Sequence, residues 1–240
     1  LNSQGKAQTF RRVHVELVEQ IVAACHAQKI GRLLHMSALN ADQSTGTSQY
    51  LRSKGEGENR AHTLGRPGIA VTSFRPSVIF GRDDSFLNRF AQLLGIPGPM
   101  PLACPDARMQ PVWAGDVAAL IARVMDEPSA FGQTLTAVGP RSYSLRELVE
   151  FTARTAGLKR KVIGLPDWAA RLQASVMDFV PGKPFSTDNY RSLQTANTSD
   201  HNALPEFGIQ PASIEAVVPG YLAQGKHQRR LDACRRHIDA

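Results

Sequence analysis

An alternation of helical and extended patterns, with glycine or proline at the junctions, constrains the fold of this chain more than any other feature. The pattern runs through a helix over 9–28, a strand over Arg32–Met36, a helix over 50–64 and a strand over Ile69–Phe74. The apolar residues that recur at helical spacing in the first helix are Val13, Leu17, Ile21, Ala24 and Cys25. We expect this stripe to face a sheet. Helices that alternate with short buried strands are typical of parallel βαβ units, so the sequence predicts an α/β fold with a parallel sheet.

Beyond Gly81 the alternation becomes less regular. We expect helices over Asn88–Leu94, from Asp116 to about Met125, after Ser144 and over 166–180, and a strand over Thr134–Val138. Asp116 is placed to cap its helix, and Ser144 with Glu147 three residues later is typical of a capping box. Residues 95–105, rich in proline and glycine, are predicted to form a loop.

Composition excludes several classes of protein. The chain has 240 residues, of which 42% are hydrophobic and 20% charged, as in folded rather than disordered proteins. Its three cysteines lie far apart, which argues against a disulfide framework or a zinc ribbon and favours a reducing compartment. No apolar run approaches ~18 residues, so no transmembrane segment is predicted. We expect a cytoplasmic protein, with a peripheral position at the inner face of a membrane as an alternative.

The net charge of +7 is concentrated in part at the C-terminal end of the chain. Residues 224–240 form a basic tail, with Leu231, Cys234 and Ile238 at helical spacing. A solvated helix is one interpretation, and docking of the tail onto a membrane surface or a partner protein is the other. Because no interleaving of basic and aromatic residues is visible, we expect no nucleic-acid partner.

The best candidates for chemistry are Ser37, Tyr50 and Lys54. Tyr50 and Lys54 are four residues apart on a predicted helix, so both side chains lie on one face. A nearby cation favours the phenolate and lowers the pKa of a tyrosine toward the range of a general acid or base. Ser37 follows a strand, at the end where open α/β sheets bind ligands. No metal site is expected, because Asp83 and Asp84 have no histidine or cysteine at ligand spacing and suit a loop or helix cap better.

In this context the chain resembles the extended, atypical branch of the short-chain dehydrogenase/reductase superfamily. The segments that carry the resemblance are HMSALNAD (35–42), YLRSKGEGE (50–58), FRPSVIFGRDDSFLNRF (74–90), QPVWAGDVA (110–118) and YSLRELVE (143–150). Within that branch the chain is most similar to the nucleotide-binding accessory subunit of respiratory complex I and its bacterial relatives. The similarity extends from residue 1 to about residue 223 and leaves out the basic tail.

The resemblance implies roles for five residues. Tyr50 would be the acid/base, Lys54 would lower its pKa and bind the nicotinamide ribose, and Ser37 would orient a substrate. Pro76 and Val78 match positions whose backbone borders the nicotinamide. The implied cofactor is NAD or NADP. The residue that discriminates between the two dinucleotides is expected upstream of residue 1.

His14 departs from the superfamily pattern, since an asparagine that helps a proton relay usually stands at this position. His14 could relay protons itself, or it could simply be a packed or surface residue. The resemblance implies a dinucleotide-binding accessory or assembly protein of complex I or a quinone-related pathway, with possible hydride transfer through Ser37, Tyr50 and Lys54. The alternatives are an active NAD(P)-dependent oxidoreductase and a nucleotide-sugar epimerase or dehydratase, each acting on a small carbonyl or alcohol.

A dinucleotide-binding sheet of this type carries a glycine-rich turn after its first strand, and the chain contains no such turn. The chain also starts at Leu1 rather than at Met. We therefore expect an N-terminally incomplete Rossmann-type sheet that retains only the later strands, with Arg32–Met36 at an unpaired edge. On this interpretation the 240 residues alone bind NAD(P)H weakly or not at all and tend to aggregate.

The expected organisation has three parts. Residues 1–81 form the later part of the dinucleotide-binding domain. Residues 82–223 form a smaller, mainly helical substrate-side region, interleaved with the last Rossmann elements at 116–138. Residues 224–240 are the basic tail.

Overall fold

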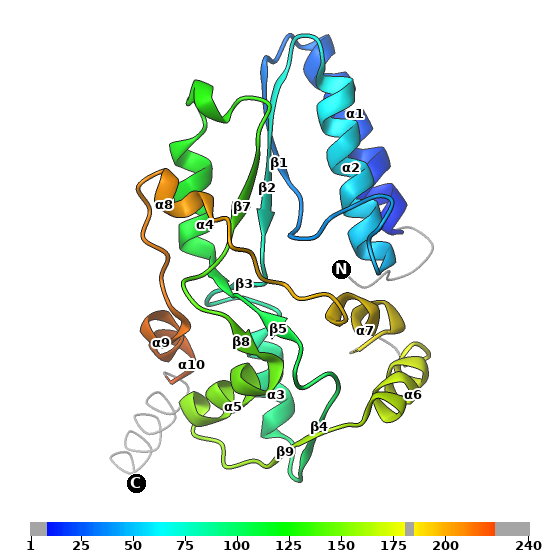
Figure 1. Cartoon of the computed structure of the whole chain (residues 1–240), viewed down its shortest axis with the longest axis vertical. Coiled ribbons are helices and arrows are strands. Elements are labelled where there is room, and N and C mark those ends of the chain that lie inside the picture. The colour runs from blue at the N-terminus through cyan, green and yellow to red at the C-terminus, as the bar shows by residue number, and fades with distance from the viewer. Residues whose placement is uncertain (1–8, 181–184, 224–240) are drawn as a thin grey trace, which may run out of the picture.

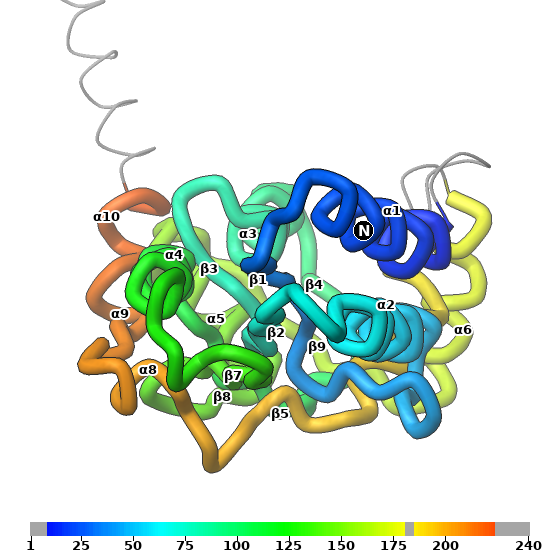
Figure 2. The backbone as a smooth tube through the Cα atoms, turned by 90° about the horizontal axis from the view of Figure 1, so that it is seen from above, coloured from blue at the N-terminus to red at the C-terminus, as the bar shows by residue number. Residues whose placement is uncertain are grey.

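A computed structural model describes residues 9–180 and 185–223 of the chain. Its centre is a three-stranded parallel sheet in the order β1-β2-β7, formed by β1 (Arg32–Met36), β2 (Ala70–Pro76) and β7 (Thr134–Ala137). The helices beside it are α1 (Leu17–Ala27), α2 (Gln49–Gly65), α4 (Ala114–Arg123) and α8 (Ala203–Glu206). Figures 1 and 2 show α1 and α2 on one face of the sheet and α4 and α8 on the other. The predicted α/β fold with a Rossmann-type parallel sheet is therefore confirmed.

Alternate residues of β2 explain the two helical layers. Val71 packs toward α1 and α2, in a cluster with Val18, Val22 and Ala61. Phe74 points to the opposite face and packs with apolar residues of α4 and α8. Because successive side chains of a strand point to opposite faces, a strand covered on both sides needs apolar residues in both sets.

The first helix has a different apolar face from the predicted one. Leu17 and Ile21, which we expected to face the sheet, are 45% and 40% exposed. The residues that follow them, Val18 and Val22, are buried instead. The cause is a π-helical segment over Arg12–Glu16, directly before α1. A π turn holds one extra residue, so it rotates everything after it relative to a regular helix. Cys25 is buried as predicted.

β1 lies at the end of the sheet. It pairs with β2 over all five of its residues, and within the described part of the chain no strand pairs with its other edge. All β1 residues are at least partly exposed, whereas five of the seven β2 residues are buried. The expectation that Arg32–Met36 lies at an edge is confirmed within the described residues.

The second half of the molecule, below the sheet in Figure 1, has its own hydrophobic cluster. The helices that contribute to it are α3 (Leu87–Gly95), α5 (Leu145–Ala156), α9 (Ile214–Val217) and α10 (Pro219–Leu222). Short strands connect this half: β3 (Ile79–Phe80) with β6 (Val112–Trp113), β4 (Met100–Leu102) with β9 (Val162–Gly164), and β5 (Arg108–Met109) with β8 (Tyr143–Ser144). The remaining elements are the short 3-10 helix Pro128–Ala130, α6 (Asp167–Met177) and α7 (Thr187–Leu193). None of the helices in the described part is long and apolar enough to cross a membrane.

The helix caps predicted in this half are present, whereas the predicted loop is only partly correct. The capping box of Ser144 and Glu147 is present at the start of α5. Asp84 accepts hydrogen bonds from the backbone of Phe86 and Leu87, which confirms it as a helix cap. The predicted loop at 95–105 is wrong in part, since it contains β4, whose partner β9 is distant in sequence.

Asp116 does not cap α4, which corrects the sequence-based expectation. It lies in the first turn of the helix, and its buried carboxylate accepts a hydrogen bond from the backbone N–H of Ala212 at 2.7 Å. Burial raises the pKa of this carboxyl group. Asp116 therefore joins α4 to the segment that precedes α9.

We predict that Gly57→Ala destabilises the protein strongly. A Cβ at this position would lie 1.9 Å from the carbonyl oxygen of His14, so α2 and the π segment could no longer pack together. Overpacking of this kind lowers the free energy of unfolding by about 1–3 kcal/mol, which urea denaturation measures. Gly95→Ala is the matched control, because a Cβ there meets nothing within 4 Å. Equal stabilities for the two variants would contradict the packing described here.

Candidate functional site

The carboxyl ends of the three sheet strands meet at one edge. Backbone hydrogen bonds continue past the strands there, from Ser37 N to Phe74 O at 2.8 Å and from Ser77 N to Ala137 O at 3.0 Å. The segments that follow β1 and β2 are therefore held side by side. This edge is where open parallel sheets bind ligands.

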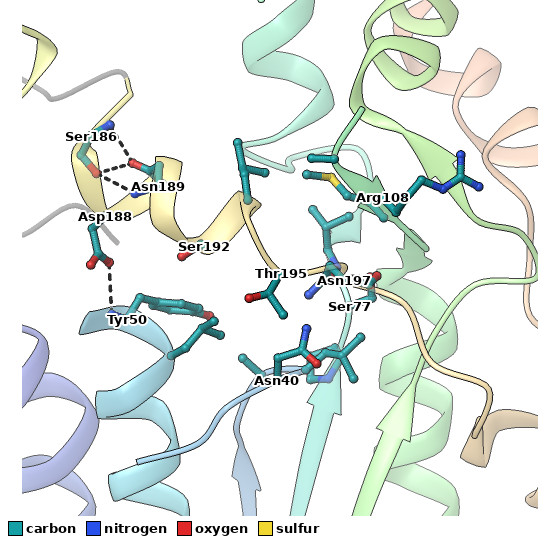
Figure 3. A pocket seen from close by; sticks show the side chains of 18 of the residues that line it. Asn40, Tyr50, Ser77, Arg108, Ser186, Asp188, Asn189, Ser192, Thr195 and Asn197 are labelled. Atoms are coloured by element: carbon teal, nitrogen blue, oxygen red, sulfur yellow. Dashed lines mark hydrogen bonds between the residues drawn. The ribbon is translucent and has the colours of Figure 1, made fainter. Parts of the chain in front are cut away.

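Helix α2 begins beside this edge. The hydroxyl of Ser48 caps it by accepting a hydrogen bond from Leu51 N at 3.1 Å. The carboxylate of Asp188, on α7, accepts two more, from Gln49 N at 2.7 Å and from Tyr50 N at 3.1 Å. Figure 3 shows Asp188 above the start of α2, next to the Tyr50 ring. A negative charge at a helix N-terminus is stabilising, so Asp188 helps to hold Tyr50 in place.

An ion pair with a buried carboxylate sets the rotation of α2 about its axis. Glu58 accepts hydrogen bonds from Arg75 Nε at 3.0 Å and from Arg75 Nη2 at 2.7 Å. The Glu58 side chain is only 6% exposed. Tyr50, Lys54 and Glu58 are spaced four residues apart, so they share one helix face. Anchoring Glu58 to the sheet therefore turns Tyr50 and Lys54 toward the same side.

Lys54 lies close to the end of β1. Its Nζ donates a hydrogen bond to the carbonyl oxygen of Met36 at 2.9 Å. Burial lowers the pKa of Lys54. Burial and the nearby Lys54 charge lower the pKa of both His14 and His35 to about 4. The ammonium group thus lies close to two histidines that are neutral at neutral pH.

The predicted lowering of the Tyr50 pKa is wrong for this arrangement. Burial raises the pKa of Tyr50 instead. Its ring packs edge-on against Phe10 and His14, at centroid distances of 6.1 and 5.6 Å. Removal of water disfavours the phenolate. Tyr50 therefore carries its proton at neutral pH.

His14 is buried directly behind Tyr50. Its Nδ1 lies 2.8 Å from the Ser53 hydroxyl, which itself donates to the carbonyl oxygen of Tyr50. The imidazole must then donate from Nδ1, which leaves Nε2 as an acceptor. That atom is buried with no hydrogen-bond partner among the described residues. His14 is thus a packed residue that supports Tyr50, and its part in a proton relay stays a prediction.

All five residues assigned from the resemblance line one cavity of about 990 Å³, between the sheet edge and the second half of the molecule. They are Ser37, Tyr50, Lys54, Pro76 and Val78. The hydroxyl of Ser37 is buried and has no hydrogen-bond partner within the described residues. A neighbouring cavity of about 310 Å³ shares Tyr50, Pro76 and Val78 with the first.

Asn197 is a site residue that the sequence did not reveal. Its side-chain oxygen accepts hydrogen bonds from the Ser77 hydroxyl and from Val78 N, the latter at 3.0 Å. Figure 3 shows Asn197 and Ser77 next to each other. These contacts hold the backbone that follows β2. No local motif marks Asn197, because it lies more than 100 residues after the segment that it supports.

Relatives of known identity confirm the resemblance seen in the sequence. The chain is 30% identical over 212 residues to "NADH dehydrogenase [ubiquinone] 1 alpha subcomplex subunit 9, mitochondrial" of Rattus norvegicus, and 31% identical over 216 residues to the Mus musculus protein of that name. It is 24% identical over 217 residues to "NADH-ubiquinone oxidoreductase 40 kDa subunit, mitochondrial" of Neurospora crassa. These matches cover 86–89% of the chain but only 55–56% of the relatives. The chain thus spans about half the length of the curated relatives it matches. No protein-family model matches it.

Solved structures agree on the fold. The dTDP-glucose 4,6-dehydratase DesIV of Streptomyces venezuelae, with NAD bound, matches with a TM-score of 0.69 and 17% identity, over 94% of this chain and 69% of that one. A nucleoside-diphosphate-sugar epimerase of Staphylococcus aureus matches with a TM-score of 0.68 and 16% identity, over 92% and 74%. A short-chain dehydrogenase/reductase superfamily protein of Agrobacterium tumefaciens, also with NAD bound, matches with a TM-score of 0.64 and 17% identity, over 97% and 79%. The chain has the fold of these proteins.

We predict that the protein loses stability as the pH falls from about 6.5 to about 4. His14 and His35 have pKa values of about 4 in the folded protein, against 6.5 for a histidine exposed to water, so the unfolded chain binds more protons in this interval. For the buried His14 the loss is at most about 3 kcal/mol. His14→Gln should flatten the pH profile of the free energy of unfolding. Ser53→Ala is the control, since it removes the partner of His14 and keeps the imidazole, so the slope should persist. An unchanged slope in His14→Gln would contradict the assignment.

We further predict that Arg75→Met lowers the free energy of unfolding by about 2–4 kcal/mol, because it leaves the carboxylate of Glu58 buried and unpaired. The double variant Glu58→Leu with Arg75→Met should recover most of this loss. The control is Arg60→Met, which removes an exposed arginine of α2 that pairs with Glu19 and Glu56. It should change the stability by no more than about 1 kcal/mol. A double variant as unstable as Arg75→Met would show that the pair does not act as one unit.

Proposed function

We propose that this chain binds NAD or NADP beside Ser37, Tyr50 and Lys54 and serves as an accessory protein of respiratory complex I. The observation that carries the proposal is the buried hydroxyl of Ser37, which has no partner among the described residues and lies in the wall that also holds Tyr50 and Lys54. A buried polar atom without a partner is destabilising. A ligand oxygen at this point would relieve that penalty.

The residues present fit the nicotinamide end of such a dinucleotide. An ammonium group has three donors, and Lys54 uses one of them on Met36 O. The others are available for the hydroxyls of a ribose. Pro76 and Val78 line the same cavity, at the positions that the resemblance assigns to the nicotinamide border. Asn197 holds the Val78 backbone in place.

A bound nicotinamide supplies the capacity to give or take a hydride. The chain's own residues would handle the substrate and its proton. The raised pKa of Tyr50 keeps a proton on the hydroxyl, which can then be donated to an oxygen that gains electrons. Ser37 can donate a hydrogen bond to the same oxygen. These properties favour an acid role of Tyr50 in the reducing direction.

The accessory role is supported by the relatives, which are subunits of NADH dehydrogenase [ubiquinone]. By this analogy we propose association with a respiratory complex and a peripheral position at the inner face of its membrane. Docking through the basic tail stays a prediction, because residues 224–240 lie outside the described residues. We also propose the division near Gly81, since the sheet and the second half have separate hydrophobic clusters.

The second candidate function is an active oxidoreductase or, within the same fold, an epimerase or dehydratase. It is favoured by the side chains of Ser37 and Tyr50, which both line the cavity, and by the Ser37 hydroxyl, which has no hydrogen-bond partner among the described residues.

We predict weak binding of NADPH or NADH, detected by saturation-transfer NMR at millimolar concentration, and loss of the nicotinamide and ribose signals in Lys54→Met. Lys159→Met removes an exposed lysine of the second half and serves as the control. Equal signals in both variants would contradict the proposed site.

Tyr50→Phe should still bind the dinucleotide but abolish any turnover with a panel of carbonyls and quinones. Turnover that survives this change would refute the catalytic role of Tyr50, and binding without turnover would favour the accessory role.

A further inference from the structure

We propose that the larger cavity binds an amphiphile, namely an apolar chain or ring system with a single carboxylate or phosphate group that pairs with Arg89. The inference that this amphiphile is the substrate rests on the proposed function, in which Tyr50 donates a proton to the reacting oxygen. The inference that the cavity binds such an amphiphile rests only on the residues that line the cavity.

Helix α3 supplies an apolar wall of the cavity. Leu87 and Leu94 are buried in the hydrophobic cluster of the second half. Phe86 and Phe90 pack against the side of the same cluster and, together with Leu93, line the cavity at helical spacing. Leu93 is 38% exposed. A ligand with an apolar body would remove this surface from water, which is favourable in proportion to the area covered.

Three of the polar side chains around the cavity are already bonded to other side chains. Ser77 is bonded to Asn197, Asn189 to Ser186, and Ser192 to Ser48. Two buried polar atoms of the lining have no partner among the described residues, the Ser37 hydroxyl and the side-chain oxygen of Gln173. A hydrophilic sugar needs many hydrogen-bond partners, whereas an apolar ligand needs only a few polar groups that fix its orientation.

Arg89 supplies a positive charge on the α3 side of the cavity, in addition to that of Lys54. It lies on the cavity side of α3, between Phe86 and Phe90, and is partly buried. Within residues 9–180 and 185–223 it takes part in no ion pair and no side-chain hydrogen bond. A guanidinium group is suited to paired hydrogen bonds with a carboxylate or a phosphate. Placed in an otherwise apolar wall, it selects an anionic group on an apolar ligand.

The test is displacement of the fluorescent probe 11-(dansylamino)undecanoic acid from the full chain by dodecanoate, dodecyl phosphate or dodecanol. We expect both anions to bind about tenfold more tightly than the alcohol, as one charge-assisted hydrogen-bonded contact provides. The better competitor of the two anions identifies the head group. Arg89→Gln should weaken both anions about tenfold and leave dodecanol unchanged. Arg82→Gln, an exposed arginine seven residues earlier, is the matched control and should change nothing.

Leu93→Gln changes the apolar wall at a position that is 38% exposed, and should weaken all three ligands. Failure of the probe to bind, or equal affinities of anion and alcohol in the wild type, would overturn the inference. Binding of NADPH is measured separately in Lys54→Met. If dodecanoate binds and NADPH does not, the proposed function fails and the cavity assignment stands. If NADPH binds and dodecanoate does not, the cavity assignment fails and the proposed function stands.

Discussion

The ion pair between Glu58 and Arg75 is the interaction on which the site depends. It joins α2 to β2 inside the layer between helix and sheet, where the Glu58 carboxylate is nearly inaccessible to water. Glu58 stands one turn after Lys54 and two turns after Tyr50, so its attachment to the sheet determines where both of those side chains point. Gly57 lets the preceding helix approach α2 closely enough to cover the Tyr50 ring. The Glu58–Arg75 ion pair and the absence of a side chain at Gly57 thus position Tyr50 and Lys54.

The layer under α2 contains several polar side chains, which has electrostatic consequences. His62 lies 2.9 Å from the hydroxyl of Ser73, and His35 and Lys54 are close enough for the ammonium to lower the histidine pKa. Burial favours the neutral forms of His14 and His35 and the protonated form of Tyr50. The site therefore holds one proton on Tyr50 and one cation on Lys54, next to imidazoles that stay neutral at neutral pH.

Elements with strong local patterns could be predicted from the sequence. Helix α2, strand β2 and the capping box of α5 follow from periodicity, Gly/Pro junctions and a short motif, and all three are present. Elements that depend on distant partners could not be predicted. β4 forms because β9 pairs with it, and the apolar face of α1 is rotated by a π segment that periodicity does not reveal. Asp116 bonds to Ala212, far along the chain, rather than to its own helix.

The same division applies to the site. The spacing of Tyr50 and Lys54 placed them on one helix face, and the strand that ends at Met36 placed Ser37 at the binding edge, because both relations follow from local backbone geometry. The tertiary structure alone decided the direction of the Tyr50 pKa shift, since burial beside Phe10 and His14 raises that pKa, and Lys54 bonds to Met36 O. It also decided the parts played by Asn197, Asp188 and Arg75. These side chains act on segments far away in the chain, and only packing brings such groups within hydrogen-bond distance.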